Sequence, residues 1–423
     1  MKGKDTIYFT IISLIVLTLI PISFGFQMGD INGDGKVNIA DVVYLFKHRN
    51  VPLGVGDLNC DDTINIADVV YLFKNYERFR SPVVFATKFT LEPNWDNGYC
   101  YLEDSKKNKF LLVINGSTAP DIPGATKITV PVHRIVTIFY SPVIATADIL
   151  GKYHDTIKGA PKYAILDSPK LTELYKEGKV LDIGSANSMN YEVVLNISPD
   201  IVFLGGWPSQ DEMEAKLRKL GIPVARCFTY EEPTYLGRIE WIKFVAAFWG
   251  KDAYKKADEY FQKVWYERNN LLRTVAKSDT YPTVVDFWKW SDTSAPYVPE
   301  AQNFYARLID LFHGRYVFSD IPGTGSTKID PETFLERAEN ADVVILRTTK
   351  NITSKEDLLK AFPNSGFENF KAFKDGRFYV SKPDYYVWET KDPIGYMRDY
   401  AKMIHPELFP DGDNNLKYYV KIK

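Results

Sequence analysis

Short apolar runs alternate with helix-like segments over most of the chain. The run RIVTIF (134–139) precedes the helix-like SPVIATADILG, and DIVFLGG (200–206) precedes SQDEMEAKLRKLG. The pattern restarts with TVVDFW (283–288) and DVVILRT (342–348). Alternation of this kind is typical of a parallel sheet with crossover helices. We therefore predict an α/β fold.

A long helical pattern divides this alternation into two parts. At 236–278, apolar residues such as Phe261 and Val264 recur near the helical period of about 3.6 residues. The alternating segments on either side, 127–235 and 279–423, are of similar size. The main body is thus predicted to consist of two Rossmann-like lobes joined by a long helix.

A strand-rich region precedes the first lobe. Residues 81–126 contain the runs VVFATKFTL, GYCYLED and FLLVING, which are rich in β-branched and aromatic residues. Turn-forming pairs such as Asn97-Gly98 and Asn115-Gly116 separate them. We expect a linker and a few antiparallel strands that lead into the first lobe.

The first 27 residues have the pattern of a targeting segment. Lys2 and Lys4 precede an apolar run at 7–24, and the small residues Ser23 and Gly25 follow the spacing of a cleavage site. The run is also nearly long enough to span a bilayer. Residues 1–27 are therefore predicted to be a signal peptide or an uncleaved membrane anchor, and both predict export.

An internal repeat occupies residues 28–80. The copies begin their loops at Asp30 and Asp57, 27 residues apart, and each loop runs into the segment IADVVYLFK. Oxygen-bearing side chains fall at loop positions 1, 3, 5, 9 and 12, with a main-chain carbonyl at position 7, a spacing that surrounds calcium with oxygens. We predict two Ca²⁺ ions, bound by Asp30, Asn32, Asp34, Lys36, Asn38 and Asp41 and by Asp57, Asn59, Asp61, Thr63, Asn65 and Asp68. Gly35 permits the sharp turn of the first loop, whereas Asp62 at the same position is expected to weaken the second site.

These duplicated loops, each with an aspartate at position 12 and no entering helix, resemble the dockerin family. The resemblance implies a small all-α, calcium-folded module that docks to a cohesin domain on another protein. In that family, loop positions 10 and 11 contact the partner. Here they are Ile39, Ala40, Ile66 and Ala67, so the near-identical copies would allow docking in two orientations through an apolar contact.

Composition narrows the class of function. The formal net charge is −2, which gives no broad basic surface for nucleic acid. The three cysteines at 60, 100 and 227 do not form a disulfide framework pattern, and no two of the five histidines have the spacing of a zinc site. Aromatic residues make up 14% of the chain, which suits a core, a sheet or a cleft that stacks flat ligands.

The order of motifs in the two lobes resembles the class III solute-binding proteins of iron-complex and cobalamin ABC importers. The resemblance rests on RIVTIFYSPVIATADILG, DIGSANSMNYEVVLNISPDIVFLGG, IDPETFLERAENADVVILRTT and DPIGYMRDYAKMIHPELF. It covers 127–412, and the strand-rich lead-in is also seen in some archaeal members. It implies capture of a metal chelate, such as a ferric siderophore, haem or corrinoid, between the lobes.

Ligand-binding residues are proposed by counting from the ends of the predicted strands, where such sheets bind ligands. They are Tyr140, Asn187, Met189, Trp207 and Tyr230 in the first lobe and Trp288, Trp290, Thr324, Arg347 and Tyr385 in the second. Each aromatic residue could instead pack in the core or at the rim. Arg347 follows an apolar strand, so it could pair with an anionic ligand or with an internal partner. The pair Tyr385-Tyr386 could also ligate ferric iron directly.

The same resemblance implies that one acidic residue in each lobe docks to arginines of the permease. Glu192, eight residues before Asp200, and Glu332, ten residues before Asp342, occupy the matching places. Either could also be an ordinary exposed helix glutamate.

Two other classes of function stay open. Dockerins most often accompany carbohydrate-active enzymes, which would need a pair of carboxylates across a sugar-binding cleft. The sequence identifies no such pair, no nucleophile elbow and no phosphate loop, so no enzymatic activity is predicted. A non-catalytic surface scaffold is the third class. The expected partners are a cohesin-domain protein, an ABC permease and a metal chelate, met outside the cell or at its surface.

Overall fold

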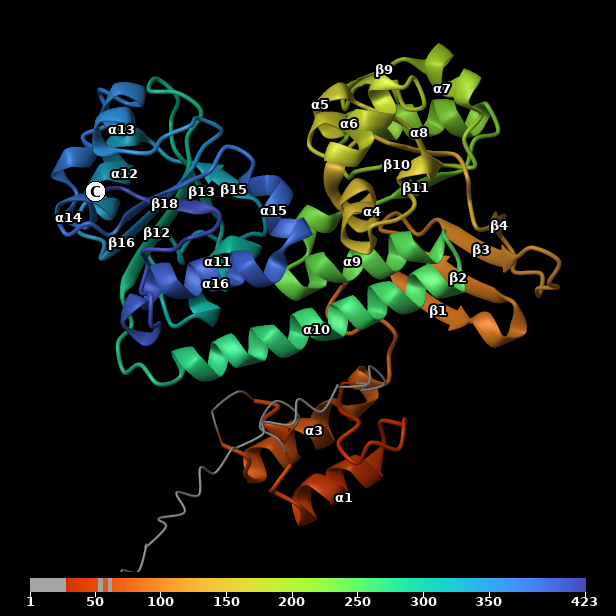
Figure 1. Cartoon of the computed structure of the whole chain (residues 1–423), viewed down its shortest axis with the longest axis horizontal. Helices are drawn as coiled ribbons and strands as arrows, with labels where there is room; N and C mark the ends of the chain where they lie inside the picture. The colour runs from red at the N-terminus through yellow and green to blue at the C-terminus, as the bar shows by residue number, and fades with distance from the viewer. Residues whose placement is uncertain (1–27, 52–55, 60–62) are drawn as a thin grey trace, which may run out of the picture.

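The computed structural model describes residues 28–51, 56–59 and 63–423. The predicted targeting segment (1–27) and loop residues Cys60, Asp61 and Asp62 lie outside the described residues. The described chain contains an N-terminal helical repeat, a small sheet, and two α/β lobes that share a long connecting helix (Figure 1).

The N-terminal repeat contributes the helices α1 (Ile39–Lys47) and α3 (Ile66–Phe79). Each begins at an asparagine, Asn38 or Asn65, whose side chain accepts a main-chain N–H of the first turn in a capping box. Leu45 and Leu72, at matching positions, have no exposed surface. The repeated sequence therefore folds into two helices that are capped in the same way.

The lead-in region forms a four-stranded sheet in the order β1-β2-β3-β4. Its strands are β1 (Thr90–Asn94), β2 (Tyr99–Glu103), β3 (Lys109–Ile114) and β4 (Ala125–Val130). The first three strands are antiparallel, but β4 runs parallel to β3. The expectation of antiparallel strands alone is corrected at this last pair, because the segment 115–124 returns the chain to the start of β3 before β4 begins.

Two buried glutamates fix the segment between the repeat and this sheet. Glu240 accepts the main-chain N–H groups of residues 84–86 at 2.7 to 2.9 Å, and Glu232 accepts those of residues 87–88 at 2.8 and 3.1 Å. Both carboxylates are at most 1% exposed, and Lys243 lies 3.1 Å from Glu240. Because a buried carboxylate needs these partners, the linker is held against the connecting helices.

The first lobe is a parallel sheet in the order β11-β10-β5-β6-β7. The strands are β5 (Ile135–Thr137), β6 (Ile157–Ala160), β7 (Leu181–Asp182), β10 (Ile201–Leu204) and β11 (Val224–Arg226). A hairpin, β8 (Gly184–Ser185) and β9 (Ser188–Met189), stands apart. The accompanying helices are α4 (Ala145–Leu150), α5 (Lys162–Leu166), α6 (Pro169–Lys176), α7 (Tyr191–Ile197) and α8 (Ser209–Lys219).

The second lobe has a mixed sheet in the order β15-β13-β12-β16-β17-β18, with β14 also paired to β12. Its centre, β12 (Thr283–Trp288), β16 (Val343–Arg347) and β17 (Phe378–Ser381), is parallel. The remaining strands are β13 (Tyr297–Pro299), β14 (Arg315–Tyr316), β15 (Ser326–Lys328) and β18 (Tyr419–Lys421). The helices are α11 (Phe304–Leu311), α12 (Pro331–Ala338), α13 (Lys355–Ala361), α14 (Lys371–Lys374), α15 (Tyr385–Lys391) and α16 (Pro393–Ile404).

Two helices connect the lobes. They are α9 (Tyr235–Ala247), which is almost entirely buried, and α10 (Lys251–Val275), which extends beneath both lobes in Figure 1. Gly250 separates them with a φ of 92°, a conformation that residues with a side chain rarely adopt. Among the described residues, no helix combines the length and the apolar composition needed to cross a membrane.

Candidate functional site

The carboxyl ends of the parallel strands define a candidate site. In the first lobe β5, β6, β10 and β11 end at one edge, and in the second lobe β12, β16 and β17 do so. We call the residues that follow these ends in both lobes the interlobe face. Such edges are where open α/β sheets bind ligands.

Helix α15 joins the two halves of the interlobe face. The Tyr386 hydroxyl donates to Asp167 at 3.1 Å, and the Thr390 hydroxyl donates to that of Ser141 at 3.3 Å. The Lys391 ammonium lies 3.2 Å from the carboxylate of Asp148. Since α15 belongs to the second lobe and the partners belong to the first, these contacts hold the two strand-end edges opposite one another.

In the first lobe, Trp207 and Tyr230 form an exposed aromatic stack. Trp207 is 44% exposed, and its ring lies 4.8 Å from that of Tyr230 at an angle of 16°. The glycine before Trp207 makes room for this stack, because a Cβ on Gly206 would lie 2.4 Å from the Tyr230 hydroxyl. Both residues were predicted ligand contacts, and the structure brings them together.

Tyr140, also a predicted ligand contact, lies behind this surface. It is 3% exposed, and its hydroxyl donates to Asp148 at 2.8 Å. His154 and Ser168 each lie 2.7 Å from the same carboxylate. Burial alone would raise the pKa of Asp148, but these hydrogen bonds and Lys391 lower it below its usual value. The Asp148 cluster therefore packs Tyr140 into the core of the first lobe.

The other predicted residues of the first lobe lie at the β8–β9 hairpin. Asn187 is exposed and accepts a hydrogen bond from Ser209 at 3.3 Å. Met189 is 6% exposed and packs in the core of the lobe. The structure therefore brings Asn187 to the surface of this lobe and Met189 beneath it.

In the second lobe, Trp288 and Trp290 lie next to each other at the end of β12. Their ring centroids are 3.5 Å apart, and Trp290 is 55% exposed. The indole N–H of Trp288 is buried without an acceptor in the described part of the chain. Thr324 is exposed, and its carbonyl accepts a hydrogen bond from Asn303 at 2.9 Å.

Arg347 already has an internal partner. It is 5% exposed, its Nε donates to Asp286 at 2.7 Å, and its guanidinium lies 3.7 Å above the Tyr305 ring. Asp286 also accepts from Tyr400 at 2.6 Å. Of the two alternatives for this arginine, the internal ion pair is present, although one Nη atom has no partner among the described residues. Tyr385, 8% exposed, lies beside it at the start of α15.

Sequence reasoning missed a group of residues after β6. Tyr163 is 47% exposed and donates to the carbonyl of Ile138 at 2.8 Å, and Leu166 is 54% exposed. Asp167 accepts from Tyr386 with one oxygen, and its other oxygen is buried without a partner in the described chain. Burial, together with the nearby carboxylate of Asp384, raises the pKa of Asp167 to about 6 against the opposing hydrogen bond from Tyr386. The sequence feature that could have revealed this group is the short strand Ile157–Ala160 (IKGA) that precedes it.

The two predicted permease-docking residues lie on separate lobes. Glu192 is in the first turn of α7 and Glu332 is in the first turn of α12, and both are exposed. In Figure 1 these helices stand on the two different lobes. Their side chains are thus accessible to another protein.

The first predicted calcium loop has the geometry of a cation site. Asp30 accepts the N–H groups of residues 33–35 at 2.8 to 3.1 Å, and Asp41 accepts those of residues 31, 32 and 38. The two carboxylates are at most 1% exposed, and no ion pair with a cationic side chain is present for either in the described chain. Gly35 has a φ of 80°, as the sharp turn requires. Two buried negative charges of this kind fit a bound cation.

The described part of the second loop repeats this pattern. Asp68 accepts the N–H groups of residues 58, 59 and 65 at 2.7 to 3.2 Å, as Asp41 does in the first loop. Its predicted ligand Asp61 lies outside the described residues. Among the residues that are described, no three His, Cys, Asp or Glu side chains converge in metal-binding geometry. The predicted sites rely on asparagine and main-chain oxygens as well, which are not among these residue types.

The helices of the repeat expose two matching apolar surfaces. Ile39 and Ile66 are each 50% exposed, and Ala40 and Ala67 beside them are exposed too. The same faces carry Val43 and Phe46 on α1 and Val70 and Phe73 on α3, which are 43% to 57% exposed. We call these the α1 face and the α3 face.

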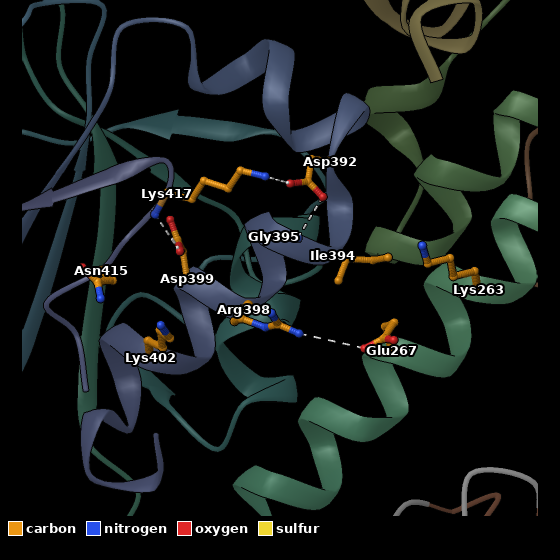
Figure 2. A pocket seen from close by; sticks show the side chains of 10 residues that line it. All are labelled: Lys263, Glu267, Asp392, Ile394, Gly395, Arg398, Asp399, Lys402, Asn415 and Lys417. Carbon is orange, nitrogen blue, oxygen red and sulfur yellow. Dashed lines mark hydrogen bonds and ion pairs between the residues drawn. The ribbon is translucent and has the colours of Figure 1, made fainter. Parts of the chain in front are cut away.

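A hollow of about 460 Å³ lies away from the interlobe face, between α10 and α16 (Figure 2). Its charges are largely paired with one another. Lys417 lies 2.6 Å from Asp392, and Arg398 lies 3.9 Å from Glu267 across the hollow. A surface with this internal compensation offers little net attraction to a charged ligand.

Comparison with known proteins agrees with the two-lobed architecture. The Periplasmic binding protein family matches residues 160–385. An uncharacterized lipoprotein of Methanocaldococcus jannaschii is 56% identical over 344 residues, which cover 81% of this chain and 87% of the relative. A second uncharacterized lipoprotein of that organism is 33% identical over 307 residues, or 70% of each chain.

Solved structures show the same fold at low sequence identity. Helicobacter pylori CeuE, in a Ni-His complex, has a TM-score of 0.54 at 18% identity, over 75% of this chain and 92% of that one. A periplasmic heme binding protein of Pseudomonas aeruginosa has a TM-score of 0.51 at 15% identity, over 69% and 98%. The predicted α/β fold of the main body is confirmed, and the chain belongs to the periplasmic binding protein family.

Proposed function

We propose that this protein is an exported, non-enzymatic receptor that captures a metal chelate between its lobes for an ABC importer. The observation that supports this best is the set of exposed aromatic rings on the interlobe face. Tyr163 and Trp207 project from the first lobe, and Trp290 and Tyr386 from the second, with 36% to 55% of each side chain exposed. Large exposed aromatic surfaces that follow the strand ends of both lobes suit a flat organic ligand such as haem, a corrinoid or a catecholate siderophore.

The charges around Arg347 favour a ligand that is held by ring stacking and hydrogen bonds rather than by an ion pair with an unpaired arginine. Asp286 neutralises Arg347, so this side chain offers only its remaining N–H to a ligand. The unpartnered indole N–H of Trp288 is a second donor in the same lobe. The Trp288 donor lies beside the exposed ring of Trp290, which suits a ligand that presents an acceptor oxygen at the edge of a flat surface.

Delivery to the importer would use the two exposed glutamates. Glu192 and Glu332 begin helices in different lobes, so a permease that contacts both would sense the distance between the lobes. The permease would then select the receptor whose lobes stand at the distance of the ligand-bound form.

The N-terminal repeat is, in this proposal, a dockerin-type module. The buried carboxylates of the first loop and the matching hydrogen bonds of the second support two Ca²⁺ ions, and the α1 and α3 faces suit an apolar contact with a cohesin domain. Two relatives are lipoproteins, which supports work at the cell surface. Residues 1–27 would supply the export signal or anchor.

The test is a fluorescence titration of the exported chain with haem, cobalamin and several ferric siderophores. We expect saturable one-to-one binding of one of these compounds. Trp207→Ala and Trp290→Ala should each weaken it by about tenfold, since the loss of stacked aromatic area is worth about 1 to 1.5 kcal/mol. The control is Tyr281→Ala, which removes a ring that is 51% exposed elsewhere in the second lobe.

Two results would argue against this proposal, the first against the class of ligand and the second against the site. Absence of binding across the panel would remove the metal chelate as ligand. Equal loss of affinity in the Tyr281→Ala control would show that the interlobe face is not the site. Turnover of a polysaccharide by the purified chain would instead favour the carbohydrate-active class.

A further inference from the structure

Three triplets in the chain have the pattern of an N-glycosylation site, which is an asparagine, any residue except proline, and then serine or threonine. They begin at Asn115, Asn196 and Asn351. All three asparagines are exposed. Glycans of this kind are attached to the surfaces of exported proteins. Because so short a triplet also arises by chance, the surroundings of each asparagine have to decide among the three.

Asn115 lies at a tight turn after β3. The N–H of Ser117 donates to the carbonyl of Ile114 at 2.9 Å, and Gly116 has a φ of 84°, which this type of turn requires at its third residue. Neither the side chain of Asn115 nor the hydroxyl of Ser117 forms a hydrogen bond with any described residue. Both functional groups of this triplet are therefore available to an enzyme.

A second turn of the same sheet holds this one in place. Gly98 lies between β1 and β2, and its carbonyl accepts the N–H of Ile114 at 2.8 Å. A Cβ on Gly98 would lie 2.4 Å from Cβ of Ser117, so the lack of a side chain there lets the two turns pack together. The asparagine of the first triplet thus belongs to an exposed turn with a defined conformation.

In the other two triplets the hydroxyl is already engaged within the fold. The Ser198 hydroxyl donates to the carbonyl of Leu195 at 3.0 Å, and the Thr353 hydroxyl donates to Asp357 at 2.7 Å. Asn196 is also part of α7, so its main chain is committed to a helix. An enzyme that acts on the folded chain would have to break these hydrogen bonds before it could bind either triplet.

The positions of the three asparagines also differ with respect to the proposed receptor. Asn196 follows Glu192 by four residues on α7, so the two side chains share one side of that helix. Asn351 follows Arg347, the last residue of β16, by four residues and so lies beyond a strand end of the interlobe face. A bulky glycan at either would crowd a surface that the receptor needs. The sheet that contains β3 lies at the opposite end of the molecule from the second lobe in Figure 1.

We propose that Asn115 carries an N-linked glycan and that Asn196 and Asn351 do not. The inference rests on the proposed export of the chain. The donor is a glycan joined to a lipid phosphate. Nδ2 of Asn115 forms a bond to the anomeric carbon of the glycan, the bond from that carbon to the phosphate oxygen breaks, and the phosphate takes up the proton that the amide loses. The glycan would shield the segment 116–124, which contains no buried residue, from proteases.

The test is tandem mass spectrometry of the full chain, purified from the cells that produce it, with electron-transfer fragmentation to locate the modified residue. We expect a glycan on the peptide that contains Asn115 and unmodified peptides around Asn196 and Asn351. Asn115→Gln and Ser117→Ala should each lose the added mass. Ser117→Thr should keep it, because threonine also completes the triplet.

Asn97 is the matched control within the same molecule. It is exposed and precedes Gly98 at the neighbouring turn, but Tyr99 stands where the triplet requires serine or threonine. Asn97 should therefore stay unmodified. A glycan on Asn97 would overturn the proposal, because attachment would then follow exposed Asn-Gly turns and not the triplet. Asn115→Gln should bind a metal chelate as the wild type does, since the turn lies away from the interlobe face.

The outcomes separate this inference from the function proposed above. A bare Asn115 in protein recovered from outside the cytoplasm would overturn the inference and leave the receptor untouched. Recovery of the chain from the cytoplasm alone would overturn the export on which both depend. A glycan on Asn196 or Asn351 in the same amount as on Asn115 would overturn the selectivity inferred from the hydrogen bonds of the three triplets.

Discussion

At the scale of single residues, the ion pair of Arg347 and Asp286 decides how the second lobe is built. Both side chains are buried on neighbouring parallel strands, Asp286 within β12 and Arg347 at the end of β16, and Tyr400 and Tyr305 complete their surroundings. A buried pair of this kind adds modest net stability, but removal of one partner leaves an uncompensated charge in the core. The two roles considered for Arg347, ligand contact and internal partner, therefore make different predictions.

Replacement of Arg347 by alanine is expected to destabilise the protein by about 3 to 5 kcal/mol, because Asp286 loses its buried partner. Urea denaturation followed by far-UV circular dichroism measures the change. Arg315→Ala, at an exposed arginine in the same lobe, should have an effect below about 0.5 kcal/mol. Wild-type stability of Arg347→Ala together with a loss of ligand binding would show that the arginine acts mainly on the ligand.

Asp167 is a residue where charge opposes folding. Burial raises its pKa to about 6, so the folded chain holds a proton more tightly than the unfolded chain, whose aspartates have a pKa of about 4. Stability therefore falls as the pH rises from about 4 to about 6, and the loss persists above that range.

Asp167→Asn keeps an acceptor for Tyr386 and removes the charge. We expect it to raise the free energy of unfolding by about 1 kcal/mol at pH 8, a value reduced for the partial exposure of the group, and by nothing at pH 4. Denaturation at the two pH values measures this difference. The same gain at both pH values would mean that ionisation of Asp167 is not the cause.

At the scale of elements, the sequence predicted the strands whose apolar runs are long and continuous. The runs before Gly205 and up to Arg347 became β10 and β16, and the helical period of Phe261 and Val264 became α10. Strand β6 was missed because its four residues include Gly159, which breaks the apolar pattern. That glycine is needed there, since a Cβ would lie 2.7 Å from side-chain carbons of Ile183 and Ile197.

The missed strand explains most of what was missed in the candidate site. Residues were proposed by counting from recognised strand ends, which found Trp207, Tyr230 and Trp290 but could not find Tyr163 or Asp167. Counting residues along the sequence also cannot tell which side chains at a strand end point into the core and which are exposed. The ion pair of Arg347 depends on Asp286 in a neighbouring strand, a contact between residues that are distant in sequence.

At the scale of the whole molecule, two helices link the lobes: α10, which runs beneath both lobes in Figure 1, and α15, which belongs to the second lobe and contacts the first. Helix α15 makes three polar contacts with the first lobe, through Tyr386, Thr390 and Lys391. Lys391 has the most buried partner, since the side chain of Asp148 is 5% exposed. A ligand that enters between the lobes would have to keep these contacts or replace them, so their strength sets how far the lobes can separate.

Replacement of Lys391 by methionine removes one of the three contacts with little harm to either lobe. Asp148 keeps its hydrogen bonds to Tyr140, His154 and Ser168, so its carboxylate stays satisfied. We expect a loss of about 1 kcal/mol from this partly buried ion pair, which corresponds to about fivefold faster hydrogen exchange in α15 and α4. Lys382→Met is the control, because the Lys382 ammonium donates to the carbonyl of Lys417 within the second lobe. If both variants exchange at the wild-type rate, the ion pair does not hold the lobes together. If only Lys391→Met exchanges faster, and does so in α15 and α4 but not in α8 or α13, the contacts of α15 limit the separation of the lobes.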